Sequence, residues 1–136
     1  MKVKELLMEG MNKRDTFSIL LDFIRFAADH LELDKLPKFD FKFDSGRSVE
    51  HSSFGGYSPG AKHITITVVN RHIMDVCRTL AHELVHFKQD LNNDLNDPDA
   101  GSTGSPQENE ANAEAAVIMR NWGKQHPELF EKESIV

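Results

Sequence analysis

Residues 82–86 read His-Glu-Leu-Val-His and lie within a stretch of helical periodicity. Residues four apart on an α-helix are separated by only about 40° around its axis and about 6 Å along it, so His82 and His86 project from one face and can share a metal ion. Glu83 lies roughly 100° around the helix from His82, where its carboxylate can reach a metal-bound water without binding the metal. The motif therefore predicts two zinc ligands, His82 and His86, and a general base, Glu83.

A catalytic zinc ion needs a third protein ligand and keeps its fourth position for water. The single cysteine, Cys77, lies five residues before His82 and falls on the apolar side of the helix, so we expect a buried hydrophobic residue there. Downstream, a polar loop over residues 92–105 leads to a second predicted helix. Ser105 fits its N-cap and Pro106 fits its first position. The third ligand is therefore expected on this second helix.

Three carboxylates of the second helix compete for the ligand role, namely Glu108, Glu110 and Glu114. We favour Glu108, because Asn112 lies one turn later on the same face and could support it by a hydrogen bond. Ser105 and Glu108 also match a capping box, in which Glu108 would bond only the backbone N–H of Ser105. If the capping role holds, Glu110 is the alternative ligand.

The H-E-x-x-H motif and the run Glu108-Asn109-Glu110-Ala111-Asn112 together resemble the gluzincin metallopeptidases, particularly minimal forms such as the ImmA/IrrE-type peptidases. The run is also similar to the E-x-E-A-D run of HtpX-like enzymes. In that pattern the first glutamate binds zinc and the residue four later supports the site, which implies these roles for Glu108 and Asn112, although Asn112 stands where many relatives have Asp. The resemblance covers about residues 64–122. Residues 78–120 are also similar to small peptidase-like proteins of tailed bacteriophages.

This resemblance implies a zinc-dependent endopeptidase with one Zn²⁺ per chain and a peptide or protein substrate. Two other functions are open at this stage. One is a noncatalytic binding or structural protein that uses zinc only to join two helices, and in a phage it would be associated with the virion. Glu83 argues against this function, because a structural zinc site needs no general base. The other is a regulatory peptidase that cleaves a single partner protein.

The chain of 136 residues is long enough for one compact domain, which we expect to span residues 1–136. Its net charge of −6 provides no basic stripe for phosphates, so nucleic acid is not an expected partner. One cysteine, no signal peptide and no long apolar run predict a cytoplasmic protein without membrane contact, in the host cytoplasm or the virion if the origin is a phage. We expect a monomer or small homo-oligomer.

Apolar periodicity predicts helices over residues 13–33 and 70–91. Alternating patterns predict strands around Phe39 to Phe43, over residues 50–57 and over residues 63–69. The expected fold is thus α+β, with an N-terminal helix, a small antiparallel sheet of about three strands, the H-E-x-x-H helix and a C-terminal helix with the third ligand.

If the last strand, residues 63–69, lies at the sheet edge beside the H-E-x-x-H helix, a peptide substrate could add to it as a further strand. Peptide hydrolysis also calls for a group that stabilises the developing oxyanion. The sequence offers three candidates for this role without deciding between them: Tyr57, His63 and His72.

Overall fold

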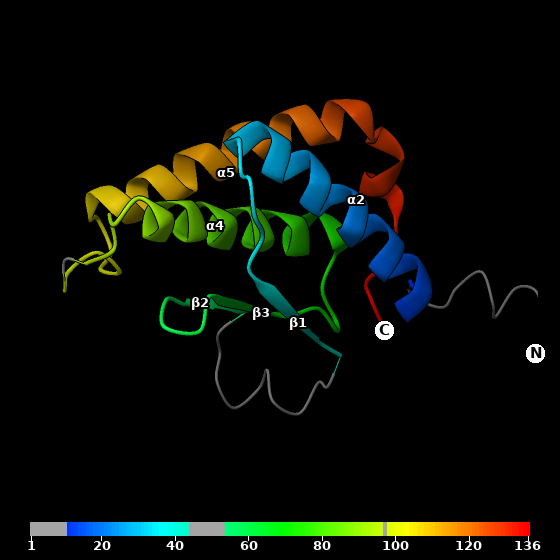
Figure 1. Ribbon diagram of the computed structural model, residues 1–136. Coiled ribbons are helices and arrows are strands. Elements are labelled where there is room, and N and C mark those ends of the chain that lie inside the picture. The colour runs from blue at the N-terminus through cyan, green and yellow to red at the C-terminus, as the bar shows by residue number, and fades with distance from the viewer. Residues whose placement is uncertain (1–10, 44–53, 97) are drawn as a thin grey trace, which may run out of the picture.

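The computed structural model describes residues 11–43, 54–96 and 98–136. In this part of the chain, three long helices accompany a three-stranded sheet, and helix α4 packs against the sheet on one side and against helices α2 and α5 on the other (Figure 1). The predicted α+β class is therefore confirmed. In chain order the elements are α2 (Lys13–Leu31), β1 (Lys38–Lys42), β2 (Gly55–Ser58), β3 (His63–Thr67), α4 (Ile73–Leu91), α5 (Pro106–Gln125) and a 3₁₀ helix, η1 (Pro127–Glu131).

Helix α2 begins and ends at recognisable caps. Asn12 accepts a hydrogen bond from the Asp15 backbone N–H at 2.8 Å, which satisfies one of the free donors of the first turn. At the other end Glu32 takes a left-handed conformation with φ 57°, and its N–H bonds back to the last turn. The helix therefore stops at Leu31, two residues before the predicted end. Its buried face includes Leu20, Phe23 and Ala27.

The sheet is mixed, which corrects the antiparallel arrangement expected from the sequence. Strand β3 lies in the centre and pairs with β2 antiparallel and with β1 parallel. Alternation of apolar residues identifies strands but does not encode their partners, and only β2 and β3 are joined by a short turn. The strand expected over residues 50–57 is observed as β2 (Gly55–Ser58), and residues 50–53 lie outside the described residues.

Strand β3 buries Ile64 and Ile66 completely. Both belong to the buried core, and the paired residues of β1, Phe39 and Phe41, pack against this core while only partly buried. Strand β3 is central, so the condition for strand addition at β3 is not met; among the described residues the edge strands are β1 and β2. Of these two, β2 packs against α4.

Helix α4 begins at Ile73, three residues later than the periodicity predicts. Asn70 has φ 62°, which is incompatible with a helix, and its N–H donates to the Ile135 carbonyl at 2.7 Å. His72 is the N-cap residue, and its Nδ1 accepts from the Met74 N–H at 3.0 Å. Residues 70–72 thus join the C-terminal segment to α4 instead of extending the helix.

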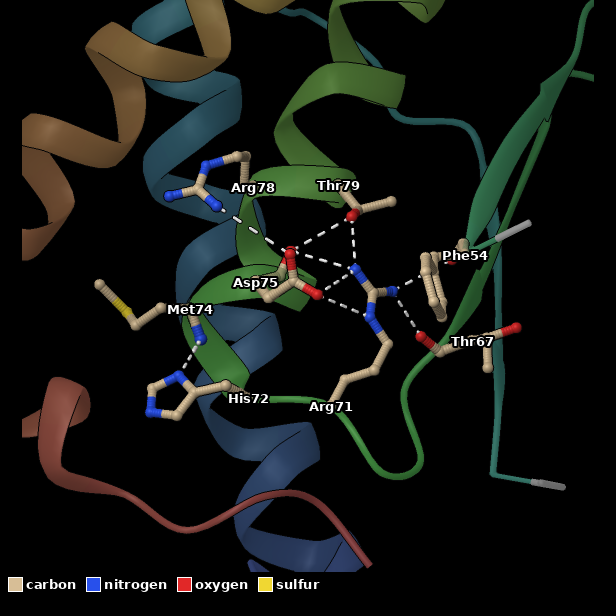
Figure 2. A network of polar contacts seen from close by, with 8 residues as sticks. All are labelled: Phe54, Thr67, Arg71, His72, Met74, Asp75, Arg78 and Thr79. Carbon is tan, nitrogen blue, oxygen red and sulfur yellow. Dashed lines mark hydrogen bonds and ion pairs between the residues drawn. The ribbon is translucent and has the colours of Figure 1, made fainter. Parts of the chain in front are cut away.

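Arg71 connects the start of α4 to the ends of β2 and β3 (Figure 2). Its buried guanidinium donates to the Thr67 carbonyl at 2.7 Å and the Phe54 carbonyl at 3.2 Å. On the helix side it donates to Asp75 at 2.9 Å and to the Thr79 hydroxyl at 2.6 Å. A buried charge is tolerated when its donors are satisfied in this way. The network fixes the position of β2 relative to α4.

Strand β2 lies close to α4 at Gly55. A β-carbon placed there would lie 2.5 Å from Thr79 Cγ2 and 2.9 Å from Ile66 Cδ1, closer than carbon atoms approach without a shift. The absence of a side chain at Gly55 therefore lets the strand lie against the helix, one turn before the H-E-x-x-H residues.

Candidate metal centre

The side chains of His82, His86 and Glu108 converge between α4 and α5. The two imidazole Nε2 atoms lie 3.1 Å apart. One Glu108 carboxylate oxygen lies 2.9 Å from His82 Nε2 and the other lies 2.8 Å from His86 Nε2. Among the described residues, these three form a group that could hold a metal ion.

The donor set and its dimensions fit a small divalent ion. A tetrahedral ion with bonds of about 2.0–2.1 Å separates its ligand atoms by about 3.3 Å, and the observed separations of 2.8–3.1 Å are only slightly shorter. Two imidazole nitrogens and one carboxylate are the ligand types of catalytic zinc sites with an open fourth position. The donor types and spacing of the three residues therefore suit such an ion.

The start of α5 brings Glu108 to the histidines. Ser105 is the N-cap, as predicted, and its hydroxyl accepts from the Glu108 backbone N–H at 3.1 Å. The Ser105 N–H bonds instead to the Ser102 carbonyl at 3.0 Å. The Glu108 carboxylate is thus not engaged in a capping box, and its two oxygens face the two imidazoles.

The two competing carboxylates of α5 have other partners. Glu110 accepts a hydrogen bond from Gln89 Nε2 at 2.7 Å, and Glu114 lies 3.2 Å from His30 Nε2. Neither belongs to the group that could hold a metal. Asn112, expected to support Glu108, is exposed, and in the described part of the chain no hydrogen bond links it to the three converging residues.

Gln89, and not Asn112, is the residue that hydrogen-bonds one of the three converging side chains and so supports the site. It lies one turn after His86 on α4, is only 2% exposed, and its Oε1 lies 2.7 Å from His86 Nδ1. The sequence contained a signal for this role, because a residue three after a ligand shares its helix face.

Glu83 is buried beside the histidines at 6% exposure. With His86 and Tyr57 it lines a cavity of about 390 Å³, and residues that follow α4, including Leu95 and Ala100, line the same cavity. Burial raises the pKa of the Glu83 carboxyl to about 7, with His86 opposing the rise and Glu108 adding to it. A carboxyl group with this pKa can accept and release a proton near neutral pH.

Of the three oxyanion candidates, Tyr57 alone lines this cavity. Its hydroxyl donates to Asp90 Oδ2 at 2.6 Å, and Lys62 Nζ lies 2.6 Å from the same oxygen. Burial and the Asp90 carboxylate raise the pKa of Tyr57 above its ordinary value, so the phenol stays protonated. His72 is occupied as the N-cap of α4, and His63, at the start of β3, is not among the residues that line the cavity.

Cys77 is completely buried in the core, as the sequence argument expected, and burial raises the pKa of its thiol. A protonated thiol surrounded by hydrophobic residues is not a metal ligand.

Comparison of the chain with protein-family models, curated proteins and solved structures finds no match. The arrangement of the site therefore carries the functional argument. In the described ranges, no helix has an apolar stretch long enough to cross a membrane.

Proposed function

We propose that the protein is a zinc-dependent endopeptidase of the minimal gluzincin type, with His82, His86 and Glu108 as zinc ligands and Glu83 as the general base. One observation carries the proposal: a buried carboxylate, Glu83, lies next to a group of three metal-ligand side chains at the wall of a cavity. The sequence resemblance to ImmA/IrrE-type peptidases supports the same assignment.

A bound zinc ion would supply a Lewis acid that lowers the pKa of water and polarises a peptide carbonyl. The chain's own contribution centres on Glu83, whose carboxylate takes the proton from the attacking water and later delivers it to the leaving amine. The burial of Glu83 matters for both steps, because a raised pKa brings the two protonation states close in free energy at neutral pH.

Strand β2 is the element best placed to hold an extended peptide substrate. It is the edge strand that packs against α4, and it carries Tyr57 into the cavity beside Glu83. Strand addition at this edge, rather than at β3, would run a peptide past the metal ligands. The Tyr57 phenol is held by Asp90 and would need to leave this partner to donate to an oxyanion.

A noncatalytic zinc protein would use the same three ligands to tie α4 to α5. Such a site gains nothing from a buried carboxylate beside an open ligand position, since burying Glu83 costs free energy when it ionises. The position of Glu83 therefore favours catalysis over a purely structural ion.

Zinc analysis and a peptide-library digest of wild type, Glu83→Gln and His82→Ala test the proposal. Wild type should contain about one zinc per chain and cleave peptides. Glu83→Gln should retain zinc and lose hydrolysis, because an amide cannot accept the proton. His82→Ala should lose both. Hydrolysis by Glu83→Gln at the wild-type rate would refute the assigned base, and full zinc content in His82→Ala would refute the metal site.

A further inference from the structure

Gln89 makes three hydrogen bonds that leave its amide with one possible orientation. Nε2 lies 3.0 Å from the Gln107 carbonyl oxygen and 2.7 Å from the Glu110 carboxylate. Both of these partners can only accept hydrogen bonds, so the group facing them must be the NH₂ that donates. The amide oxygen of Gln89 is consequently the atom that faces His86, at 2.7 Å from Nδ1.

An amide oxygen only accepts, so His86 must donate to it from Nδ1. A neutral imidazole that carries its hydrogen on Nδ1 presents a lone pair on Nε2. In this structure Nε2 is the atom that points toward His82 and Glu108. The orientation of the Gln89 amide thus selects the form of His86 that can bind a metal.

The Gln89 side chain also links α4, which carries His82 and His86, to α5, which carries Glu108. Gln107 and Glu110, the partners of Nε2, flank Glu108 on the first turns of α5, whereas Gln89 belongs to α4. Its 2% exposure keeps water from competing for these bonds. Gln89 therefore sets the distance between the turn that carries Glu108 and the turn that carries His86.

We infer that Gln89 is a positioning residue of the metal centre, which fixes His86 with its hydrogen on Nδ1 and holds Glu108 within reach of the same ion. The inference rests on the proposed metal site but not on peptidase activity. A chain that binds zinc and cleaves no peptide would refute the proposed enzyme and leave the role of Gln89 intact.

The test is zinc affinity, measured by competition with a chelator, for Gln89→Leu beside Glu114→Gln, a control on α5 that does not contact Gln89. Gln89→Leu keeps the approximate volume and removes all three hydrogen bonds, and it should weaken zinc binding by about 10–100-fold. Glu114→Gln removes a carboxylate from α5 that pairs with His30, and it should bind zinc nearly as wild type does. Wild-type affinity in Gln89→Leu would overturn the inference.

A second pair of variants separates positioning from general stability. Gln89→Glu can still accept from His86 but places a carboxylate against the Gln107 carbonyl and Glu110, so zinc binding should weaken. Adding Glu110→Gln supplies an amide donor to the introduced carboxylate and restores the net charge, and the double variant should recover part of the lost affinity, because the Gln107 carbonyl still faces an oxygen. A double variant as weak as Gln89→Glu alone would overturn the inference, including in the case that Gln89→Leu does not fold.

Nitrogen NMR of the imidazoles in the zinc-loaded protein gives a readout that a purely structural role would not change. In wild type and in the double variant, the His86 Nδ1–H should exchange slowly with water because it is hydrogen-bonded and shielded. In Gln89→Leu this signal should broaden or vanish. A slowly exchanging Nδ1–H that persists in Gln89→Leu would show that another group holds the ring, against the inference.

Discussion

Replacing Glu83 by Gln in the metal-free protein should make folding more stable at neutral pH. Burial raises the pKa of Glu83 from an ordinary value of 4.5 to about 7, and a rise of about 2.5 pKa units corresponds to about 3 kcal/mol. The folded protein holds this proton between about pH 4.5 and 7, where the unfolded chain has already released it. The free energy of unfolding therefore falls as the pH rises through this window.

The amide of Glu83→Gln has no such titration. The difference in unfolding free energy between variant and wild type should be near zero at about pH 4.5 and grow to about 3 kcal/mol above pH 7. Urea unfolding in the presence of a chelator, at intervals from pH 4.5 to 8, measures this difference directly. The exposed Glu131, changed to Gln, serves as a control that removes a carboxylate without removing a buried charge. Parallel pH profiles for wild type and Glu83→Gln would refute the reasoning from burial.

Glu108→Ala should reduce zinc affinity by orders of magnitude, because it removes a proposed ligand. Ser105→Ala should lose only the helix cap, which costs about 1 kcal/mol of stability, and should keep its zinc. Equal zinc affinity in the two variants would contradict the ligand assignment. Ile135 is completely buried, so Ile135→Ala should cost about 2–5 kcal/mol in chemical unfolding, and a loss well under 1 kcal/mol would mean that the C-terminal segment is not packed as described. Gly55→Ala should cost about 1–3 kcal/mol because its methyl group meets Thr79 Cγ2 at 2.5 Å. Adding Thr79→Ser removes that methyl while keeping the hydroxyl for Arg71, and should restore much of the loss; no recovery would place the clash elsewhere.

Local patterns were sufficient to predict the three long helices and the common face of His82 and His86. The i, i+4 spacing of His82 and His86 fixes their common face whatever the tertiary structure, and Ser105-Pro106 sets the phase of α5, so the side on which Glu108 projects follows from the sequence. The alternatives at Glu110 and Glu114 could be decided only from the structure, because their partners Gln89 and His30 come from other helices.

Features that depend on long-range pairing were not predictable. The parallel pairing of β1 with β3 and the resulting edge position of β2 depend on which strand fills the centre, and strand composition does not specify this. The late start of α4 has the same origin. Residues 70–72 read Asn-Arg-His and contain no proline or glycine that would end a helix, but the hydrogen bond from Asn70 to Ile135, which lies 65 residues further along the chain, holds Asn70 outside the helix.

The two ligand helices are joined by residues 92–105, and this loop also provides a wall of the cavity beside Glu83. An ion held by His86 and Glu108 would therefore cross-link the two ends of the loop and reduce the number of conformations open to it. Removing the ion should make the loop more susceptible to cleavage by an added protease, since exposed loops are cut when they can detach from the domain. Loss of the metal would then also change the shape of the cavity, because the ion would link the two ends of the loop that lines it.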